Sequence, residues 1–218
     1  MQAADSLPLP TAEDIPDPDN RRRARLATLR ARPLVATLRA TALRVGDVCN
    51  LDRNAVAVAR GTGGYLRVRV AKTEHAAHVV LGQRALHAID VYLAERSDWS
   101  PWIFIQHGRT GSPPHVRQLS SEAYRRRKRG YGARISPGFV RGIVVGLARD
   151  AGYDPDKDQF VSTHAFRHWH AQRMVDQGAS IDDVQSVLGH ARSETTREVY
   201  APEPNIPRII DAEKEIQS

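Results

Sequence analysis

The chain has 218 residues, and its 32 lysine and arginine residues outnumber 25 aspartate and glutamate residues, which gives a net charge of +7 and an isoelectric point near 10. Only four of the basic residues are lysines, which leaves 28 arginines. An arginine-rich, basic chain favours a phosphate-rich partner, because guanidinium groups pair bidentately with phosphate. A GC-rich genome would explain the ratio of arginine to lysine but not the net charge.

Other features of the composition exclude whole classes of protein. A hydrophobic content of 41% is enough for a real core. The single cysteine, Cys49, excludes an internal disulfide and fits a reducing cytoplasm. No apolar run approaches the ~18 residues of a membrane span, and the N-terminus lacks the apolar core of a signal peptide. We therefore expect a soluble, cytoplasmic protein without a membrane partner.

The first third of the chain predicts an arm followed by helices. Residues 1–19 are rich in proline, aspartate and alanine, which is typical of a linker or a disordered arm, so we expect that an N-terminal domain was removed or lost. Asp19 and Asn20 are predicted to cap a first helix, which Pro33 interrupts. Pro33 is then predicted to occupy the first position of a second helix. A third, short helix is predicted over Val45–Leu51.

From residue 54 the pattern predicts a small three-stranded antiparallel sheet. Ala55–Ala59 is a short apolar run, Tyr65–Val70 alternates as a half-buried strand does, and His78–Leu81 is a third apolar run. Glycine residues at 61, 63 and 64 suit the first turn, and Lys72 lies in the second turn. The remaining pattern is helical, so the fold class that we predict is α+β and mostly α-helical.

The middle of the chain predicts two helices around a basic segment. Gln83–Arg96 reads as a helix, and residues 102–106 read as a short buried segment. Residues 107–134 form a long polar region whose basic run is either a solvated charge run or a DNA contact. That run consists of Arg125, Arg126, Arg127, Lys128 and Arg129. Ser136 or Pro137 is predicted to open a helix through Arg149, with Phe139, Ile143 and Leu147 on its core side.

The stretch from Ser162 to Tyr200 predicts two helices and a third short one. Ser162 or Thr163 suits the N-cap of the first, on which His164 and Arg167 share a face. The predicted core stripe of that helix is Phe166, Trp169, His170 and Met174. Gly178 is expected to stop it. Ser180, with Asp183 three residues later, caps the second helix, which buries Ile181, Val184, Val187 and Leu188.

Gly189 ends the second helix and places His190 on the exit turn, and the third helix carries Tyr200. Taken singly, a histidine and arginine pair at this spacing is usually solvated, and a tyrosine at a helix end usually packs. Together, on consecutive short elements, these residues suit the transfer of a DNA phosphodiester onto a tyrosine.

The same residues resemble the tyrosine recombinase (phage integrase) family, whose motif is roughly H-x-L-R-H, L-G-H and T-T-x-x-Y. T-H-A-F-R-H matches at 163–168, L-G-H at 188–190, and T-T with the tyrosine at 195–200. The family's first arginine lies in a T-G-L-R-x-x-E-L junction, which T-A-L-R-V-G-D-V matches at 41–48, and its lysine lies in a hairpin turn. The chain departs from the pattern in two places. Ala42 replaces a glycine, so the junction is expected to lack a residue with positive φ, and Tyr200 follows His190 by one residue more than is usual.

The resemblance implies a role for each matching residue. Arg44 and Arg167 would clamp the phosphate, with His190 as a further donor and Asp47 as the carboxylate that supports Arg44. Tyr200 would be the nucleophile, His164 the proton-transfer group and Lys72 the acid for the leaving oxygen. The product would be a 3′-phosphotyrosine linkage, formed without a metal, another cofactor or ATP.

The resemblance also implies an organisation. Residues 20–205 would form the catalytic domain, without the family's usual N-terminal domain, and would grip double-stranded DNA. Residues 206–218 would be a tail that docks on a neighbouring protomer in a homotetramer on DNA. Three alternatives stay open: a metal site at His164, His168 and His170, a DNA-binding module without activity, and a type IB topoisomerase.

Overall fold

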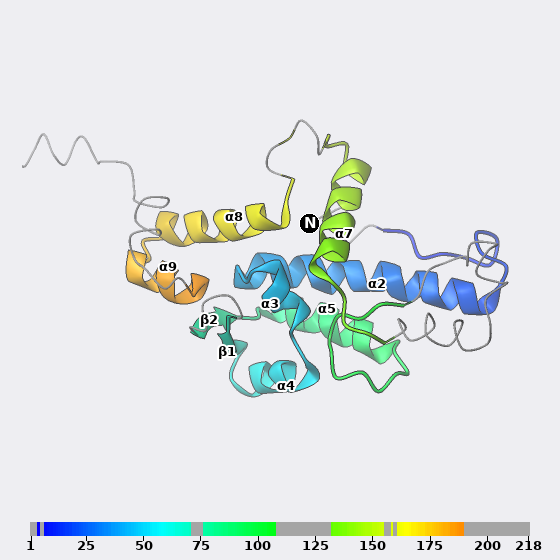
Figure 1. The fold of residues 1–218 in the computed structure, drawn as a ribbon, viewed down its shortest axis with the longest axis horizontal. Coiled ribbons are helices and arrows are strands. Elements are labelled where there is room, and N and C mark those ends of the chain that lie inside the picture. Colours follow the sequence, from blue (N-terminus) through cyan, green and yellow to red (C-terminus); the bar gives the residue numbers. More distant parts are fainter. Residues whose placement is uncertain are drawn as a thin grey trace, which may run out of the picture.

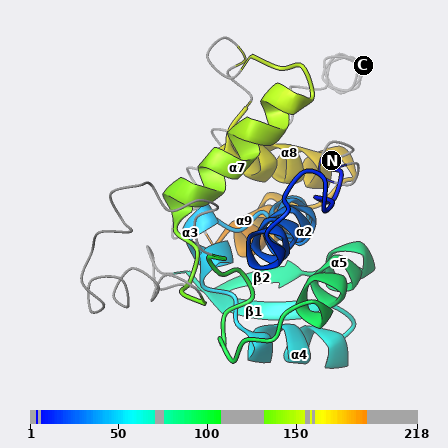
Figure 2. The same ribbon diagram turned by 90° about the vertical axis from the view of Figure 1, so that its right-hand side faces the viewer.

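The computed structural model describes residues 4, 7–70, 76–107, 132–154, 158 and 161–189. Its helices and strands follow in this order: α2 (Pro18–Thr41), α3 (Val45–Cys49), α4 (Arg53–Gly61), β1 (Tyr65–Arg69), β2 (Ala76–Val80), α5 (Gln83–Ala94), α7 (Pro137–Asp150), α8 (Thr163–Asp176) and α9 (Ile181–Leu188). The long helix α2 runs through the middle of the molecule, with α5 alongside it (Figure 1). Figure 2 shows α7 and α8 on one side of α2 and the sheet with α4 on the other. The predicted class, α+β and mostly helical, is confirmed.

The sheet within the described residues has two strands, and the predicted third strand is wrong. β1 and β2 are antiparallel, with Tyr65 opposite Val80 and Arg69 opposite Ala76. Residues 55–59 belong instead to α4, whose N-cap Asp52 accepts a hydrogen bond of 2.7 Å from the amide of Ala55. Alternating alanine and valine imitate a strand, but alanine favours helix and the cap satisfies a free amide at the helix start.

Helix α2 is continuous, so the prediction that Pro33 interrupts it is also wrong. The helix starts earlier than expected, because the side chain of Asp17 accepts a hydrogen bond of 2.7 Å from the amide of Asn20. A proline inside a helix costs about 3 kcal/mol. Burial of Leu26, Leu34 and Leu38, on both sides of Pro33, offsets that cost.

Helix α2 ends at Ala42, which has a φ of 52° and is the only non-glycine residue with positive φ among the described residues. The expectation that this junction lacks such a residue is therefore wrong. Alanine takes the left-handed conformation that glycine adopts more readily. Ala42 is fully buried and packs in a small cluster with Ala171, Val184 and Leu188, so α2, α8 and α9 meet at this point.

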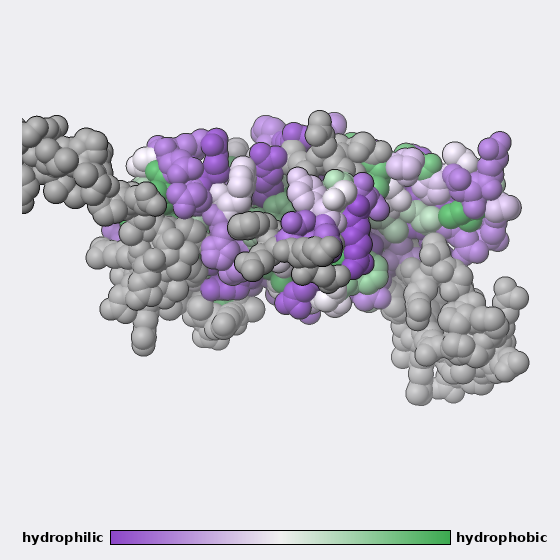
Figure 3. Space-filling view, turned by 90° about the horizontal axis from the view of Figure 1, so that it is seen from above, coloured by the Kyte–Doolittle hydropathy of each residue, from purple (hydrophilic) through white to green (hydrophobic). Residues whose placement is uncertain are grey.

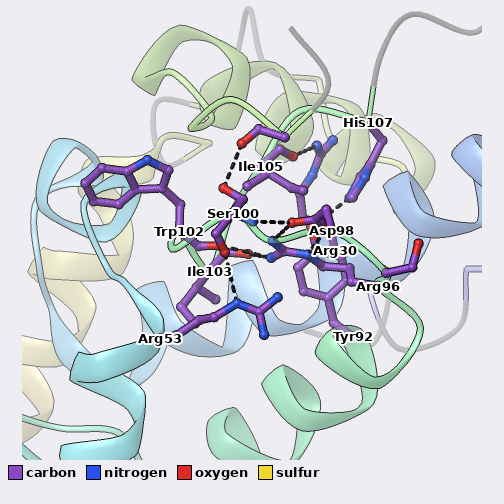
Figure 4. A network of polar contacts seen from close by, with 12 residues as sticks. Arg30, Arg53, Tyr92, Arg96, Asp98, Ser100, Trp102, Ile103, Ile105 and His107 are labelled. Carbon is purple, nitrogen blue, oxygen red and sulfur yellow. Dashed lines mark hydrogen bonds and ion pairs between the residues drawn. The ribbon is translucent and has the colours of Figure 1, made fainter. Parts of the chain in front are cut away.

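A buried polar network ties α2 and α5 to the segment that follows α5 (Figure 4). Tyr92 Oη lies 2.7 Å from Nε2 of His107. The guanidinium of Arg96 donates to Asp98 and to the carbonyls of residues 102 and 103, and Arg30 donates to the carbonyl of residue 105. The predicted buried segment is confirmed, because residues 103–105 are fully buried.

Helix α7 starts as predicted, with the side chain of Ser136 accepting a hydrogen bond of 3.3 Å from the amide of Phe139. Its buried residues are Val140 and Val144, whereas Phe139, predicted for the core, is 48% exposed. The ring of Phe139 instead lies against the guanidinium of Arg30, 4.9 Å from its centroid. Ile143, on the predicted side, packs partly buried against the core.

Hydrophilic residues dominate the described face that Figure 3 shows, with only small hydrophobic areas between them. Within the described residues, no helix is both long and apolar enough to cross a membrane.

Candidate active site

Arg167 and Asp47 are the most deeply buried of the predicted site residues that the structure describes. Ser162 caps α8, as predicted, by accepting a hydrogen bond of 3.1 Å from the amide of Ala165. Arg167 follows on the second turn and is 3% exposed. Its Nη1 donates to the carbonyl of Ala42 at 2.8 Å, and its Nη2 donates to the carbonyl of Leu188 at 2.6 Å.

Both carbonyls lie at helix C-termini, since Ala42 is the C-cap of α2 and Leu188 is the last residue of α9. Carbonyl groups at such positions lack partners within their helix and carry a partial negative charge. Arg167 therefore satisfies two helix ends at once, and these two bonds fix the orientation of its guanidinium.

Arg44 lies at the N-cap of α3, in an extended conformation with φ of −62° and ψ of 147°. The side chain is half-buried, and among the described residues its buried Nη1 has no hydrogen-bond partner. A buried donor without a partner is costly and is usually met by water, an ion or a ligand. Asp47 follows in the first turn of α3, is 3% exposed, and donates its amide to the carbonyl of Arg44 at 2.8 Å.

A cavity of about 430 Å³ brings Arg44, His164 and Arg167 together, although Arg44 is separated from the other two by more than a hundred residues of chain. Its walls come from the junction of α2 and α3, the start of α8, and one side of α7. The lining residues are Leu43, Arg44, Val45, Arg141, Val145, Val161, Ser162, Thr163, His164 and Arg167. None of these ten is acidic, so the cavity suits an anion.

His164 lines this cavity and is exposed, and its ring meets that of His168 edge to face, with 4.5 Å between the centroids. Partial burial lowers the pKa of His164, and the neighbouring His168, Arg167 and Arg44 lower it further. The imidazole is therefore neutral at neutral pH and able to accept a proton.

The predicted core stripe of α8 is only partly right. Phe166 and Met174 pack partly buried against the hydrophobic core, as predicted. The fully buried residues of α8 are instead Thr163, Arg167 and Ala171, and Trp169 is 43% exposed beneath the guanidinium of Arg39, 4.5 Å from the ring centroid. His170 Nδ1 lies 2.9 Å from the carbonyl of Arg39. His170 thus faces α2 and is engaged there, and the described residues gather no cluster of three or more potential metal ligands. The alternative of a metal site at 164, 168 and 170 has no support in this arrangement.

Helix α9 carries the chain towards His190. Ser180 and Asp183 form the predicted capping box, and Val184 and Leu188 are buried. Gly189 then takes a φ of 59°, and a Cβ at this position would lie 2.8 Å from Cγ2 of Val70. Gly189 immediately precedes His190, and Val70 immediately precedes the connection that contains Lys72. The residues that directly precede His190 and the segment with Lys72 are therefore neighbours in space.

The sequence model of the phage integrase family matches residues 17–204. The chain belongs to this family. Among curated relatives, it is 30% identical over 169 residues to the tyrosine recombinase XerA of Pyrococcus furiosus, covering 78% of this chain and 49% of that protein. It is 32% identical over 178 residues to the tyrosine recombinase XerD of Brucella suis, covering 79% of this chain and 48% of that protein. The chain of this phage integrase family member thus spans about half the length of these relatives.

Solved structures show that the fold is shared. A crystal structure of XerA recombinase has a TM-score of 0.56 at 22% identity and covers 95% of this chain and 65% of its own. XerH recombinase bound to its difH substrate has a TM-score of 0.60 at 16% identity and covers 100% of this chain and 51% of its own. A lambda integrase dimer on a COC′ core site has a TM-score of 0.52 at 18% identity, with coverage of 89% and 48%.

Several predicted positions lie outside the described residues of this integrase-family chain. They are Lys72, His190, Tyr200, the basic run Arg125–Arg129, and the tail at 206–218. Their roles remain predictions.

One cavity residue, Arg141, received no role from the sequence. The sequence of α7 does contain a pattern that could have identified Arg141, because residues four positions apart lie on the same face of a helix. Val140 and Val144 form the buried pair, and Arg141 and Val145, one position further, both line the cavity. Phe139, Ile143 and Leu147 recur at the same interval, so the sequence favours them as the core side of the helix.

Proposed function

We propose that this chain is the catalytic domain of a site-specific DNA recombinase, an integrase that cleaves and rejoins DNA strands through a covalent 3′-phosphotyrosine. The proposal rests on the cavity that holds Arg44, His164 and Arg167, in which the described lining residues include no acidic side chain. Membership of the phage integrase family supports it, as do the names of the curated relatives.

The cations would act on the scissile phosphate. Its non-bridging oxygens gain negative charge as phosphorus becomes five-coordinate, and fixed donors stabilise that state more than the ground state. Arg167, oriented by the carbonyls of Ala42 and Leu188, would donate to these oxygens, and so would Arg44, whose Nη1 has no hydrogen-bond partner within the described part of the chain. His190 would supply a further donor, and Asp47 would support Arg44.

Tyr200 would attack phosphorus. Its phenol, with an ordinary pKa of about 10, must lose a proton to become a good nucleophile, and the neutral His164 imidazole would accept it. The bond between tyrosine oxygen and phosphorus forms while the bond between phosphorus and the 5′-oxygen breaks, and Lys72 would protonate that oxygen. Attack by a 5′-hydroxyl on the phosphotyrosine reverses the sequence. The phosphodiester energy is retained, so neither ATP nor a metal is required.

On DNA we propose a homotetramer in which residues 206–218 dock on a neighbouring protomer. This chain matches only about half the length of the curated relatives, and the family's N-terminal domain would complete the grip on the duplex. Analytical ultracentrifugation on DNA should show weaker assembly after deletion of 206–218. Unchanged assembly would remove the docking role of the tail.

Strand cleavage tests the function directly. Duplexes selected for binding from a randomised pool would be nicked near candidate cleavage points, incubated with protein and run on a denaturing gel. We expect a covalent adduct with wild type, in EDTA as well as without it, and none with Tyr200→Phe. An adduct that vanished in EDTA and returned with zinc would refute metal-free cleavage. Tight binding without cleavage would indicate an inactive DNA-binding module, and relaxation of supercoils without sequence preference would indicate a topoisomerase.

A further inference from the structure

The cavity contains a third arginine, Arg141, to which the proposed reaction gives no role. Three arginines line it, and each comes from a different part of the fold: Arg44 from the start of α3, Arg167 from α8 and Arg141 from α7. In the proposed function, Arg44, Arg167 and the predicted His190 would donate to the two non-bridging oxygens of the scissile phosphate. Arg141 is left without an assigned partner in the reaction.

Arg141 differs from the other two arginines in its surroundings. Arg167 is 3% exposed and bound to two main-chain carbonyls, and Arg44 is half-buried. Arg141 is exposed and lines the cavity on the wall that α7 contributes, so its side chain is accessible to an anion from solvent. A guanidinium group is planar and can donate two parallel hydrogen bonds to the oxygens of one phosphate.

The position of Arg141 on α7 follows from packing. Val140 and Val144 are buried against the core, which fixes the rotation of the helix about its axis. Arg141 and Val145 each lie one position after a buried valine and are about one helical turn apart, so they share a face. That face lines the cavity. Arg149, also on α7, is exposed as well but does not line the cavity.

We propose that Arg141 binds the phosphodiester next to the scissile one on the cleaved strand, and thereby positions the strand for attack. This inference rests on the proposed function and adds a DNA contact to it. With Arg44 and Arg167 on the reacting phosphate and Arg141 on its neighbour, the strand is held at two points. Two points fix its direction as well as its depth in the cavity.

Single methylphosphonate substitutions, each of which neutralises one phosphate, test the assignment on the nicked duplex. For wild type we expect a loss of affinity of roughly 10-fold, the scale of one charge-assisted hydrogen bond, at one phosphate adjacent to the scissile position. Arg141→Ala should bind the unmodified duplex about as weakly as wild type binds the duplex with that neutralised phosphate. Its affinity should not fall further when the same phosphate is replaced by methylphosphonate. Its salt slope should fall by about one. Arg141→Lys should keep part of the affinity, and Arg149→Ala, the matched control, should behave as wild type.

The outcomes separate the two proposals. If wild type forms no covalent adduct, the proposed function fails. If it does form one, and Arg141→Ala responds to every neutralised phosphate as wild type does, then the assignment of Arg141 is wrong. It is also wrong if Arg141→Ala becomes insensitive at the scissile phosphate instead of its neighbour. Far-ultraviolet circular dichroism of each variant excludes unfolding as the cause.

Discussion

Arg167 and Ala42 are joined by a hydrogen bond of 2.8 Å, which the guanidinium donates to the carbonyl of an alanine in the left-handed conformation. The φ of 52° at Ala42 ends α2 and leads the chain directly to Arg44 at the start of α3. One unusual backbone conformation therefore helps to fix the orientation of one cavity arginine and the position of another.

Two substitutions at Ala42 distinguish the effect of its left-handed conformation on stability from the effect of burying its methyl group. Ala42→Gly relieves a left-handed conformation that costs roughly 1–2 kcal/mol, but loses a buried methyl group and gains unfolded-state entropy. We expect stability within about 1 kcal/mol of wild type. Ala42→Val, which is β-branched, should destabilise by more than about 2 kcal/mol and slow adduct formation. Urea denaturation measures both, and a stable, active valine variant would contradict the role of Ala42.

Alanine substitution of the two predicted clamp arginines should have unequal effects on stability. Arg167→Ala leaves the carbonyls of Ala42 and Leu188 buried without their donors, which should cost about 2–4 kcal/mol. Arg44→Ala removes a guanidinium whose Nη1 has no partner among the described residues, so we expect a change within about 1 kcal/mol. Both variants should lower the adduct rate by roughly 100-fold or more. Equal unfolding midpoints would show that the bonds of Arg167 contribute little.

The pKa of His164 can be measured in the free protein by NMR titration of its ring. We expect a midpoint below the ordinary value of 6.5, because burial and the adjacent His168, Arg167 and Arg44 disfavour its protonated form. His168→Ala removes one of these charges, so the midpoint should rise while staying below 6.5. The acid limb of adduct formation should move in the same direction. No change in His168→Ala would mean that the ring contact does not influence His164.

His107 should make the fold sensitive to acid. Burial, followed by Arg30 and Arg96, lowers the pKa of His107 from 6.5 to about 3. Between these values the unfolded chain binds one more proton than the folded protein. Stability should therefore fall as pH decreases below 6.5, by up to about 1.4 kcal/mol per unit.

His107→Phe removes this titration together with the hydrogen bond to Tyr92. The variant should be about 1 kcal/mol less stable than wild type at pH 8, and its stability should depend less on pH below 6.5. Urea midpoints measured from pH 8 to pH 4 give both quantities. Carboxylates contribute the same slope to both proteins, so parallel curves would refute the part played by His107.

Two glycines with positive φ should tolerate alanine differently. At Gly178, with φ of 83°, a Cβ would meet nothing within 4 Å, so alanine should cost only the backbone strain of roughly 1–2 kcal/mol. At Gly189 the Cβ would also press on Val70 and Ala77, at 2.8 Å and 3.2 Å, which adds overpacking of about 1–3 kcal/mol. Gly189→Ala should also slow adduct formation by displacing the chain next to His190. Equal unfolding midpoints would contradict the close approach of α9 to the sheet.

Helix caps could be predicted from the sequence because they are local. Ser136, Ser162, and the pair Ser180 and Asp183 bond to amides three residues away or closer, so the residues that decide the structure stand together in the chain. The site motifs were likewise readable, and the structure brings Arg44, His164 and Arg167 to one cavity.

What the sequence did not predict depends on contacts between distant residues. Phe139 and Trp169 were both expected in the core, and both are partly exposed beneath arginines of α2, Arg30 and Arg39. A ring covered by a guanidinium needs no apolar burial, and the arginine lies more than a hundred positions away in the sequence. The continuity of α2 through Pro33 has the same origin, since packing against other elements overrides the local preference.

The covalent attachment of DNA to Tyr200 is tested most directly by identifying the residue that carries the nucleotide. After cleavage and nuclease treatment, trypsin should release residues 198–208 as one peptide, since arginines at 197 and 208 bound it, and Tyr200 is its only tyrosine. Mass spectrometry should find a residual nucleotide on this peptide and on no other. A nucleotide on a peptide with a different tyrosine, or on a serine, would contradict the account.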